Sequence, residues 1–281
     1  RLHVGLQGIG LLEAAWQKAS AYAAERRQMR APGAKDTSLI QDHPAIRRTL
    51  QTQRAWIDGG RVLAYHTALQ LDVAKHSTDA GERAAAQRWC ALVTPVLKAA
   101  LTDQGFHGAS ACLQVFGGHG YVSEWGIEQI VRDARVAMIY EGTNEIQAID
   151  LLVRKVLADG GKSMNALLDT IAADLPQAAM ASKAHTSAQA RIQTLRAVTE
   201  QIVKAAPKDP ALAFRVADDY LRAVALVLMD WAWLRIEAGV DADTPQADTR
   251  WLSPAKALRS WVLPEFQMRS AIIAQQCADA K

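Results

Sequence analysis

Apolar residues recur every three or four positions along most of the chain, which is the spacing of one face of an α-helix. In the first segment this stripe consists of Leu6, Ile9, Leu12, Ala15, Ala19 and Tyr22. Pro32 disfavours helical geometry at the residue before it, so the first helix is expected to span 2–30. Further helices are expected from His43-Pro44 onward and over 82–102.

Residues 105–120 interrupt this pattern with five glycines. A helix here must end at the Phe116-Gly117-Gly118 step, because glycine readily takes the left-handed conformation that terminates helices. A short charged helix is expected over 127–135, followed by an extended apolar segment over 136–140. Asn144 stands three residues before Gln147, which resembles a capping box that opens a helix over 144–157.

The Asp159-Gly160-Gly161-Lys162 step is the best candidate for a domain boundary. Beyond it, helical spacing recurs over 164–181, 187–206, 210–239 and 254–280, with a polar loop at 241–245. The predicted fold is therefore all-α, with a four-helix up-and-down bundle over 1–158 and a second helical domain over 159–281 for packing or oligomerisation. The four tryptophans of the second domain are expected to be core or interface anchors rather than a ligand box: Trp231, Trp233, Trp251 and Trp261.

The composition excludes several classes of protein. Among 281 residues, 50% are hydrophobic and 22% charged, which excludes wholesale disorder. A net charge of +3 is too small to indicate nucleic-acid binding. No apolar run reaches the roughly 18 residues of a membrane span. Cys90, Cys112 and Cys277 form no CxxC pair or zinc pattern, so we expect reduced thiols and no metal site. Because the chain begins at Arg1 rather than Met, we also expect residues upstream of it.

The strongest candidate chemistry lies in the Tyr140-Glu141-Gly142-Thr143 segment. An apolar run is followed by the carboxylate of Glu141 and then by Gly142, directly before a helix. Apolar surroundings favour the protonated form of a carboxylate, which suits a general base working near neutral pH. From the residues alone, Glu141 is either such a base or an ordinary loop residue near a helix N-terminus. Gln114 with Gly117-Gly118 forms a second, weaker candidate, in which bare backbone could approach a ligand.

Three segments, in this order, resemble the C-terminal helical domain of flavin-dependent acyl-CoA dehydrogenases. They are AYAAERRQ at 21–28, LQVFGGHGY at 113–121 and RDARVAMIYEGTNEIQ at 132–147. The separation of Gln114 from Glu141, 141 − 114 = 27, also fits the family. The resemblance covers 1–156. The remainder resembles the helical extension of the longer subgroup that includes methylthiopropanoyl-CoA dehydrogenases.

The resemblance implies a role for Glu141 as the base that removes the α-proton of an acyl-CoA thioester, while the β-hydride passes to N5 of FAD. It implies that the backbone N–H of Glu141 helps to hold the thioester carbonyl, and it places Tyr140 and Gly142 beside the substrate. An arginine at the position of Arg1 lines the acyl-CoA pocket in several relatives. On this reading Glu141 is expected to be buried and to face a cleft.

The resemblance also implies a cofactor site. Arg26 matches an arginine that contacts the flavin pyrophosphate, and Gln114, Gly117 and Gly118 match the segment along the adenosine-pyrophosphate part of FAD, usually across a subunit interface. Thr143 matches a contact to a cofactor phosphate, although it could also be an ordinary helix cap. Glu145 stands where some relatives have an amide, which leaves its role open.

The implied partners are an acyl-CoA substrate, an electron-transfer flavoprotein and further copies of the chain in a homo-oligomer. The expected location is the bacterial cytoplasm, with a mitochondrion as the alternative. The family's other domains supply the flavin-ring contacts, so these 281 residues alone are expected to bind FAD weakly and to be inactive. Two alternatives remain: an acyl-CoA oxidase-type flavoenzyme, and a non-catalytic binding protein on the same fold.

Overall fold

The structure is a computed structural model that describes residues 1–176, 182–240 and 248–280, and these residues are almost entirely helical. They form no β-sheet, and their one β-bridge joins Arg27 to Leu39. The all-α prediction is therefore confirmed. None of the described helices is long and apolar enough to cross a membrane.

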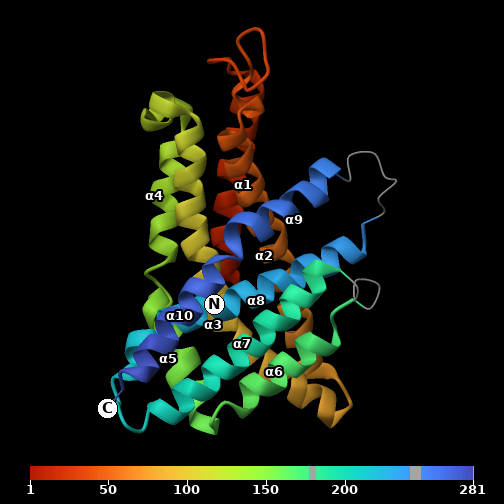
Figure 1. The fold of residues 1–281 in the computed structure, drawn as a ribbon, viewed down its shortest axis with the longest axis vertical. Helices are drawn as coiled ribbons and strands as arrows, with labels where there is room; N and C mark the ends of the chain where they lie inside the picture. Colours follow the sequence, from red (N-terminus) through yellow and green to blue (C-terminus); the bar gives the residue numbers. More distant parts are fainter. Residues whose placement is uncertain (177–181, 241–247, 281) are drawn as a thin grey trace.

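The first half of the chain is built from long helices joined by short turns. In chain order the elements are α1 (Leu2–Glu25), η1 (Ile40–Asp42), α2 (Pro44–His76), α3 (Ala80–Val115), η2 (Gly117–Tyr121), η3 (Ser123–Trp125), α4 (Ile127–Ala137), α5 (Asn144–Leu151), η4 (Leu152–Val156) and η5 (Leu157–Asp159). Figure 1 shows α1, α2, α3 and α4 side by side as an up-and-down bundle, with the segment that joins α1 to α2 at one end. The expected stripe of α1 is buried: Ile9, Leu12, Ala15 and Ala19 face the core.

The helices α1 and α3 approach each other closely because glycines lie at their crossing. A Cβ atom built at Gly8 would lie 2.5 Å from the carbonyl oxygen of Leu101, and one at Gly105 would lie 2.7 Å from the carbonyl oxygen of Gly8. Both contacts are shorter than van der Waals packing allows, so only glycine fits. The expected end of the third helix near residue 102 is therefore wrong, because α3 runs through Gly105, which serves packing between helices. The predicted helix end at Phe116-Gly117 is confirmed, since α3 ends at Val115 and Gly117 is in the left-handed region.

Three further boundaries differ from the sequence prediction. The first helix ends at Glu25 rather than Arg30, because residues 26–40 fold back on themselves through backbone hydrogen bonds such as Ile40 N–H to the Arg26 carbonyl. Residues 136–140 are not extended: α4 continues to Ala137 and a turn follows. The cap of α5 is Thr143 rather than Asn144, since the Thr143 hydroxyl oxygen accepts from the Ile146 N–H at 3.3 Å.

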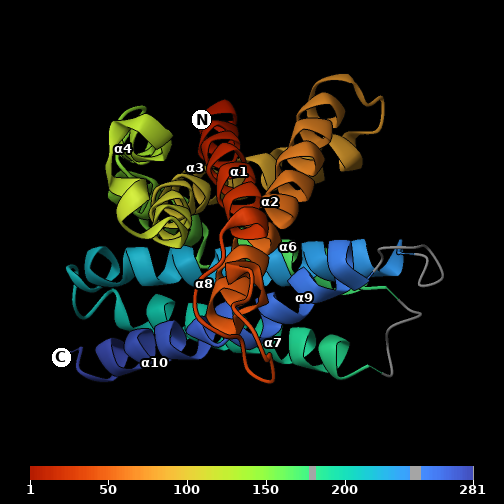
Figure 2. The ribbon, with the colours of Figure 1, turned by 90° about the horizontal axis from the view of Figure 1, so that it is seen from above.

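The second half adds a layer of helices that crosses the bundle. Its elements are α6 (Lys162–Ala173), α7 (Lys183–Ala205), α8 (Leu212–Ala238), η7 (Asp248–Leu252), α9 (Ser253–Ala257), η8 (Leu258–Val262) and α10 (Glu265–Ala278). Figure 2 shows α7, α8 and α10 side by side, running across the bundle helices. The α8 helix packs against α2, where the Trp233 indole N–H donates to the Ala55 carbonyl at 2.9 Å.

One hydrophobic core runs through both halves of the chain. Trp231 and Trp233 belong to it, as expected, whereas Trp261 is 54% exposed beneath the guanidinium of Arg48. The chain turns at Gly160-Gly161, both in the left-handed region, and the division into two domains there stays a prediction. The helix expected over 164–181 is shorter than predicted, since α6 ends at Ala173. The expected polar loop at 241–245 lies outside the described residues.

Candidate active site

The turn between α4 and α5 carries Glu141. Its backbone is in the left-handed region, with φ of 56°, and Gly142 follows with φ of 88°. A residue with a Cβ seldom adopts this conformation, so the surrounding contacts must hold it there. Strained backbone of this kind occurs preferentially at functional sites, which marks the turn as a candidate for chemistry.

Lys98 of α3 supports this turn from below. Its side chain is 0% exposed, and its ammonium group donates to the Gly142 carbonyl at 2.7 Å, the Asn144 side-chain oxygen at 3.0 Å and the Met138 carbonyl at 3.3 Å. Burial lowers the pKa of Lys98, because the interior disfavours its charged form. The sequence offered a signal for this residue, since Lys98 is a lone charge within the apolar run 96–101.

Gln147 of α5 holds the same turn from the other side. Its side-chain amide donates to the Glu141 carbonyl at 3.2 Å and to the Gly142 carbonyl at 3.4 Å. Gln147 is fully buried, so this amide is fixed in place. Together, Lys98 and Gln147 fix the backbone on both sides of the Glu141 side chain. Neither residue was predicted to belong to the site.

The Glu141 side chain points outward from this rigid turn. It is exposed, and within the part of the chain that the structure describes its carboxylate makes no ion pair or hydrogen bond. The prediction that Glu141 is buried in a cleft is therefore wrong for this chain. A carboxylate without a partner on a fixed backbone is nevertheless free to meet a ligand.

The other residues predicted beside the substrate lie around the same turn. Tyr140 is 40% exposed and its hydroxyl donates to the side chain of Gln7 on α1. Arg1 is exposed and pairs with Asp150 of α5 at 3.2 Å. Arg1 is thus tied to α5, the helix after the turn, whereas Tyr140, Glu141 and Gly142 lie in the turn itself.

Thr143 and Glu145 lie at the start of α5. The Thr143 hydroxyl oxygen caps the helix, so the ordinary role that the sequence left open is present. Hydrogen bonds from its own backbone N–H and from Thr143 lower the pKa of Glu145. Glu145 is therefore a stable anion at the helix N-terminus, where the free N–H groups favour negative charge.

Four of the five predicted cofactor residues form a second group, in a groove at the far end of the bundle, whereas Thr143 lies apart from it at the start of α5. Arg26, Gln114, Gly117 and Gly118 all line this groove, whose cavity volume is about 560 Å³. It forms where α3 ends at Val115 and the segment after α1 folds back beside it. The sequence predicted these four residues, and the structure brings them together.

An aromatic cluster that was not predicted stabilises the groove. The ring of Tyr22 stacks on Phe116 with centroids 4.3 Å apart, and its hydroxyl lies 2.9 Å from Nδ1 of His119. The His119 ring in turn stacks on Trp125 at 5.1 Å. Tyr22, Phe116 and His119 line the groove, so these rings give it an apolar wall. The sequence offered no signal for this cluster, because Tyr22 lies on α1 and the other rings lie in residues 116–125, far away along the chain.

The groove has the features that a phosphate-containing ligand requires. The Arg26 side chain is exposed, and it makes no ion pair with any residue that the structure describes. A Cβ atom at Gly117 or Gly118 would meet no atom within 4 Å, so the space above both glycines is open to a ligand. A guanidinium suits a diphosphate because it donates a fork of hydrogen bonds. The residues present thus fit the pyrophosphate and adenosine part of FAD.

The two groups lie at different levels of the bundle. Lys98, beneath Gly142, and Gln114, in the groove, are 114 − 98 = 16 residues apart on α3, which corresponds to roughly 24 Å at 1.5 Å per residue. Glu141 and the groove therefore cannot both contact the same small group of a ligand. One long ligand, or two separate ligands, would be needed to occupy both.

The all-helical bundle, the groove with Arg26 at its end and the turn with a lone carboxylate define the class as an all-helical domain with two candidate ligand sites. The sequence profile described as "Acyl-CoA dehydrogenase, C-terminal domain" matches residues 1–157, more than half of the chain. The chain therefore belongs to the acyl-CoA dehydrogenase family, as the three sequence segments indicated.

Individual relatives agree with this assignment. The 3-methylmercaptopropionyl-CoA dehydrogenase of Ruegeria pomeroyi is 36% identical over 237 residues, which cover 82% of this chain and 40% of that protein. A crystal structure of an acyl-CoA dehydrogenase from Bacillus anthracis, in complex with FAD, matches 97% of this chain and 48% of its own at a TM-score of 0.76 and 16% identity. Acyl-CoA oxidase 1 of Arabidopsis thaliana matches 100% of this chain and 46% of its own at a TM-score of 0.70 and 18% identity.

At these identities the two structures bear on the fold alone. Because the match to the oxidase covers the whole chain, the extension beyond residue 159 shares its fold with known members of this structural group. The chain spans less than half the length of each of these relatives.

Proposed function

We propose that this chain is the C-terminal part of an FAD-dependent acyl-CoA dehydrogenase, which converts an acyl-CoA thioester to the 2-enoyl-CoA. The observation that carries the proposal is the Glu141 turn. A carboxylate without a partner projects from a strained backbone that Lys98 and Gln147 hold in place. Such preorganisation suits a base that must meet one particular C–H bond.

In the proposed reaction the Glu141 carboxylate removes the proton on carbon 2 of the acyl group. The backbone N–H of Glu141 donates to the thioester carbonyl and stabilises the negative charge that develops on its oxygen. The same residue would thus supply the base and one carbonyl contact. This dual use explains why the turn is fixed through its carbonyl oxygens, which leaves the Glu141 N–H and side chain available.

When bound, the flavin of FAD supplies the acceptor for the hydride from carbon 3. Arg26 would pair with the pyrophosphate, while Gln114 and the open backbone at Gly117-Gly118 would lie along the adenosine side. The Thr143 hydroxyl would redirect its hydrogen from the Glu145 carboxylate to a phosphate, while its oxygen still caps α5. Because the groove and Glu141 are roughly 24 Å apart along α3, we propose that the groove serves the FAD of a neighbouring subunit in a homo-oligomer.

The substrate contacts in the proposal are Arg1, Tyr140 and Gly142. All three lie around the Glu141 turn, and the exposed Arg1 offers a cation to the acyl-CoA. An electron-transfer flavoprotein would take the electrons from the reduced enzyme, and the bacterial cytoplasm would be its location. The rest of the protein would cover Glu141 from the side that the bundle leaves open, and these 281 residues alone would not turn over.

An acyl-CoA oxidase is the second candidate. It is favoured by the similarity of the fold to acyl-CoA oxidase 1 over the whole chain, including the helical extension. The two activities share the removal of the α-proton and differ in whether the electrons pass to a flavoprotein or to oxygen. Consumption of oxygen during turnover would favour the oxidase.

The test is a Glu141→Gln variant of the complete native protein, with Glu145→Gln as the matched control four residues away. Replacing the base while keeping its shape is expected to lower dehydrogenation by about 10²-fold or more. Flavin absorbance should show the same amount of bound FAD. The Glu145→Gln variant should retain its activity. Full activity in Glu141→Gln, or loss only in Glu145→Gln, would reject the proposed base.

A further inference from the structure

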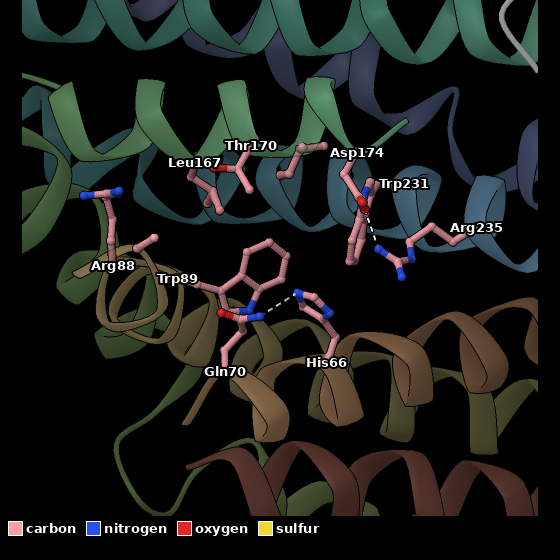
Figure 3. Close-up of a pocket in the computed structure, with 11 residues that line it drawn as sticks. His66, Gln70, Arg88, Trp89, Leu167, Thr170, Asp174, Trp231 and Arg235 are labelled. Atoms are coloured by element: carbon pink, nitrogen blue, oxygen red, sulfur yellow. Dashed lines mark hydrogen bonds and ion pairs between the residues drawn. The ribbon is translucent and has the colours of Figure 1, made fainter. Parts of the chain in front are cut away.

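A small pocket lies between the bundle and the helical extension, and its lining includes no residue of the proposed active site. Its walls come from four helices: α2 and α3 on one side, α6 and α8 on the other. Figure 3 shows the indole of Trp89 and the ring of His66 along one wall and Leu167 and Thr170 along the opposite wall. Arg88 lies at one end, and Asp174 with Arg235 at the other.

The size and the walls of this pocket suit one aromatic ring. The cavity volume is about 160 Å³, and an apolar protein cavity of about 150 Å³ is known to take benzene. The His66 ring packs edge-on against Trp89 at 4.6 Å and against Trp231 at 5.2 Å. Leu167 and Ile171 close the other side and are almost completely buried. A flat ring could continue this aromatic packing, for which offset or edge-on contacts are favourable.

Most polar groups of the pocket already have partners. The Trp231 indole N–H donates to Asp174 at 2.9 Å, and the Arg235 guanidinium pairs with the same carboxylate. The Trp89 indole N–H donates to the Thr67 hydroxyl at 3.0 Å. Burial, and then the charge of Arg235, lower the pKa of His66, so its ring is uncharged near neutral pH. These groups add no net charge to the pocket.

Arg88 is the exception. Its side chain is half-buried at the end of the pocket, and the described residues offer it neither an ion pair nor a hydrogen bond. A partly buried guanidinium without a partner attracts a carboxylate, which it can hold with two parallel hydrogen bonds. The pocket therefore carries one positive charge at one end and an aromatic wall beside it.

We propose that this pocket is a binding site for a small monocyclic aromatic carboxylate, with the ring packed between the Trp89–His66 wall and Leu167 and the carboxylate on Arg88. Gln70, whose amide makes only a long contact of 3.5 Å to His66, can donate a further hydrogen bond to the ligand. The site uses no residue of the proposed flavin or substrate groups, so the inference does not depend on the proposed function. A ligand here would link the bundle to the extension.

The experiment titrates benzoate into the 281-residue chain and follows binding by ligand-observed NMR. Two control compounds are titrated in the same way: benzyl alcohol, which lacks the carboxylate, and cyclohexanecarboxylate, which lacks the aromatic ring. We expect saturable benzoate binding that is tighter than binding of either control compound. Arg88→Gln should weaken benzoate binding about tenfold and leave benzyl alcohol unchanged, because it removes a charge-assisted pair. Arg154→Gln removes an exposed guanidinium outside the pocket and should have no effect.

A second variant tests the location without removing core contacts. Thr170→Phe adds a ring at an exposed position on the pocket wall, and it should abolish benzoate binding while the thermal unfolding temperature stays close to that of the parent chain. The inference is overturned if benzoate shows no saturable binding at millimolar concentrations. It is also overturned if neither Arg88→Gln nor Thr170→Phe weakens binding, or if cyclohexanecarboxylate binds as tightly as benzoate.

Discussion

The ammonium nitrogen of Lys98 lies 2.7 Å from the carbonyl oxygen of Gly142, and this contact joins the middle of α3 to the turn that carries Glu141. A charged group that is fully buried is costly unless it is well paired, so its presence here requires a specific use. The lysine fixes a backbone that is strained at Glu141. The position of the proposed base is thus set by a residue on another helix.

Replacing Lys98 should loosen this turn without unfolding the chain. Each of the oxygens it contacts has a second donor, such as the Asn144 N–H for the Met138 carbonyl, so none is left unpaired. We expect Lys98→Met to change the free energy of unfolding by less than about 2 kcal/mol, since lost hydrogen bonds offset the removed cost of burying a charge. The amide hydrogen of Asn144 should exchange faster in hydrogen-exchange measurements.

Lys155→Met is the matched control for Lys98→Met. Lys155 also donates to a backbone carbonyl, that of Ala91 at 2.7 Å, and to the Asp150 carboxylate at 2.9 Å, but it makes no hydrogen bond to residues 138–144. Hydrogen exchange at Asn144 should be the same as in the parent chain. Equal exchange rates in the Lys98→Met and Lys155→Met variants would show that Lys98 does not hold the turn.

Because α1 and α3 cross closely at Gly8 but not at Gly10, replacing these two glycines by alanine should change the free energy of unfolding in opposite directions. Gly8→Ala places a Cβ atom against the backbone of Leu101, and overpacking of this kind is expected to lower the free energy of unfolding by about 1–3 kcal/mol. Gly10→Ala meets no atom within 4 Å and should raise stability by about 0.5–1 kcal/mol, because alanine favours helix. Urea unfolding measures both. Equal effects would contradict the close contact of the two helices.

If FAD binds in the groove, substitutions of the neighbouring residues Arg26 and Arg27 should differ in their effect on the affinity for FAD. In the complete native protein, Arg26→Gln should weaken FAD binding about tenfold or more, because it removes a guanidinium that faces the groove. Arg27→Gln is the control, since Arg27 donates to the Thr37 carbonyl at 2.9 Å instead. Equilibrium dialysis with FAD compares the two. Equal affinities in both variants would contradict the assignment of the groove.

Gly118 offers a test of the same groove that does not involve charge. Its backbone conformation accepts other residues, and the space at its Cβ position is open. Gly118→Leu should therefore fold normally and reduce FAD binding by filling the groove. Circular dichroism and bound flavin per chain report the two properties separately. Unchanged FAD content with a native helical spectrum would exclude a ligand at this end of the bundle.

Protonation of His66 is expected to lower the free energy of unfolding of the chain at acidic pH. Its folded-state pKa lies below its ordinary value of 6.5, so below that pH the unfolded chain binds more protons than the folded chain. Its contribution to stability is constant above pH 6.5 and falls as the pH drops toward the folded-state pKa. The urea midpoint of His66→Gln should depend less on pH in this window than that of the parent chain. The exposed His3, changed to Gln, should leave the dependence unchanged.

The sequence predicted the helices well because their apolar stripes are long and regular. It placed the end of the third helix near residue 102, because the glycines from Gly105 onward looked like an interruption, whereas Gly105 admits a neighbouring helix. It also misjudged residues 136–140, where a run of apolar side chains suggested an extended segment. Val136, Ile139 and Tyr140 are 51%, 50% and 40% exposed, so they face outward from a helix end and a turn.

The candidate site was predicted in part. The motif-based residues Arg26, Gln114, Gly117 and Gly118 do meet in one groove, although 88 residues separate the first two, 114 − 26. The contacts that hold the turn were missed, because Lys98 reaches it from 43 positions away, 141 − 98, and only the packing of α3 against α5 brings them together. The burial of Glu141 could not be judged from sequence, since it depends on what surrounds the turn.

The most direct measurement of the central claim is hydrogen exchange at carbon 2 of a bound thioester. The complete native protein is incubated in D₂O with an acyl-CoA thioester, and mass spectrometry follows deuterium at carbon 2. The account predicts exchange in the native and Glu145→Gln proteins and none in Glu141→Gln. Exchange at the native rate in Glu141→Gln would contradict it, because another group would then be removing the proton.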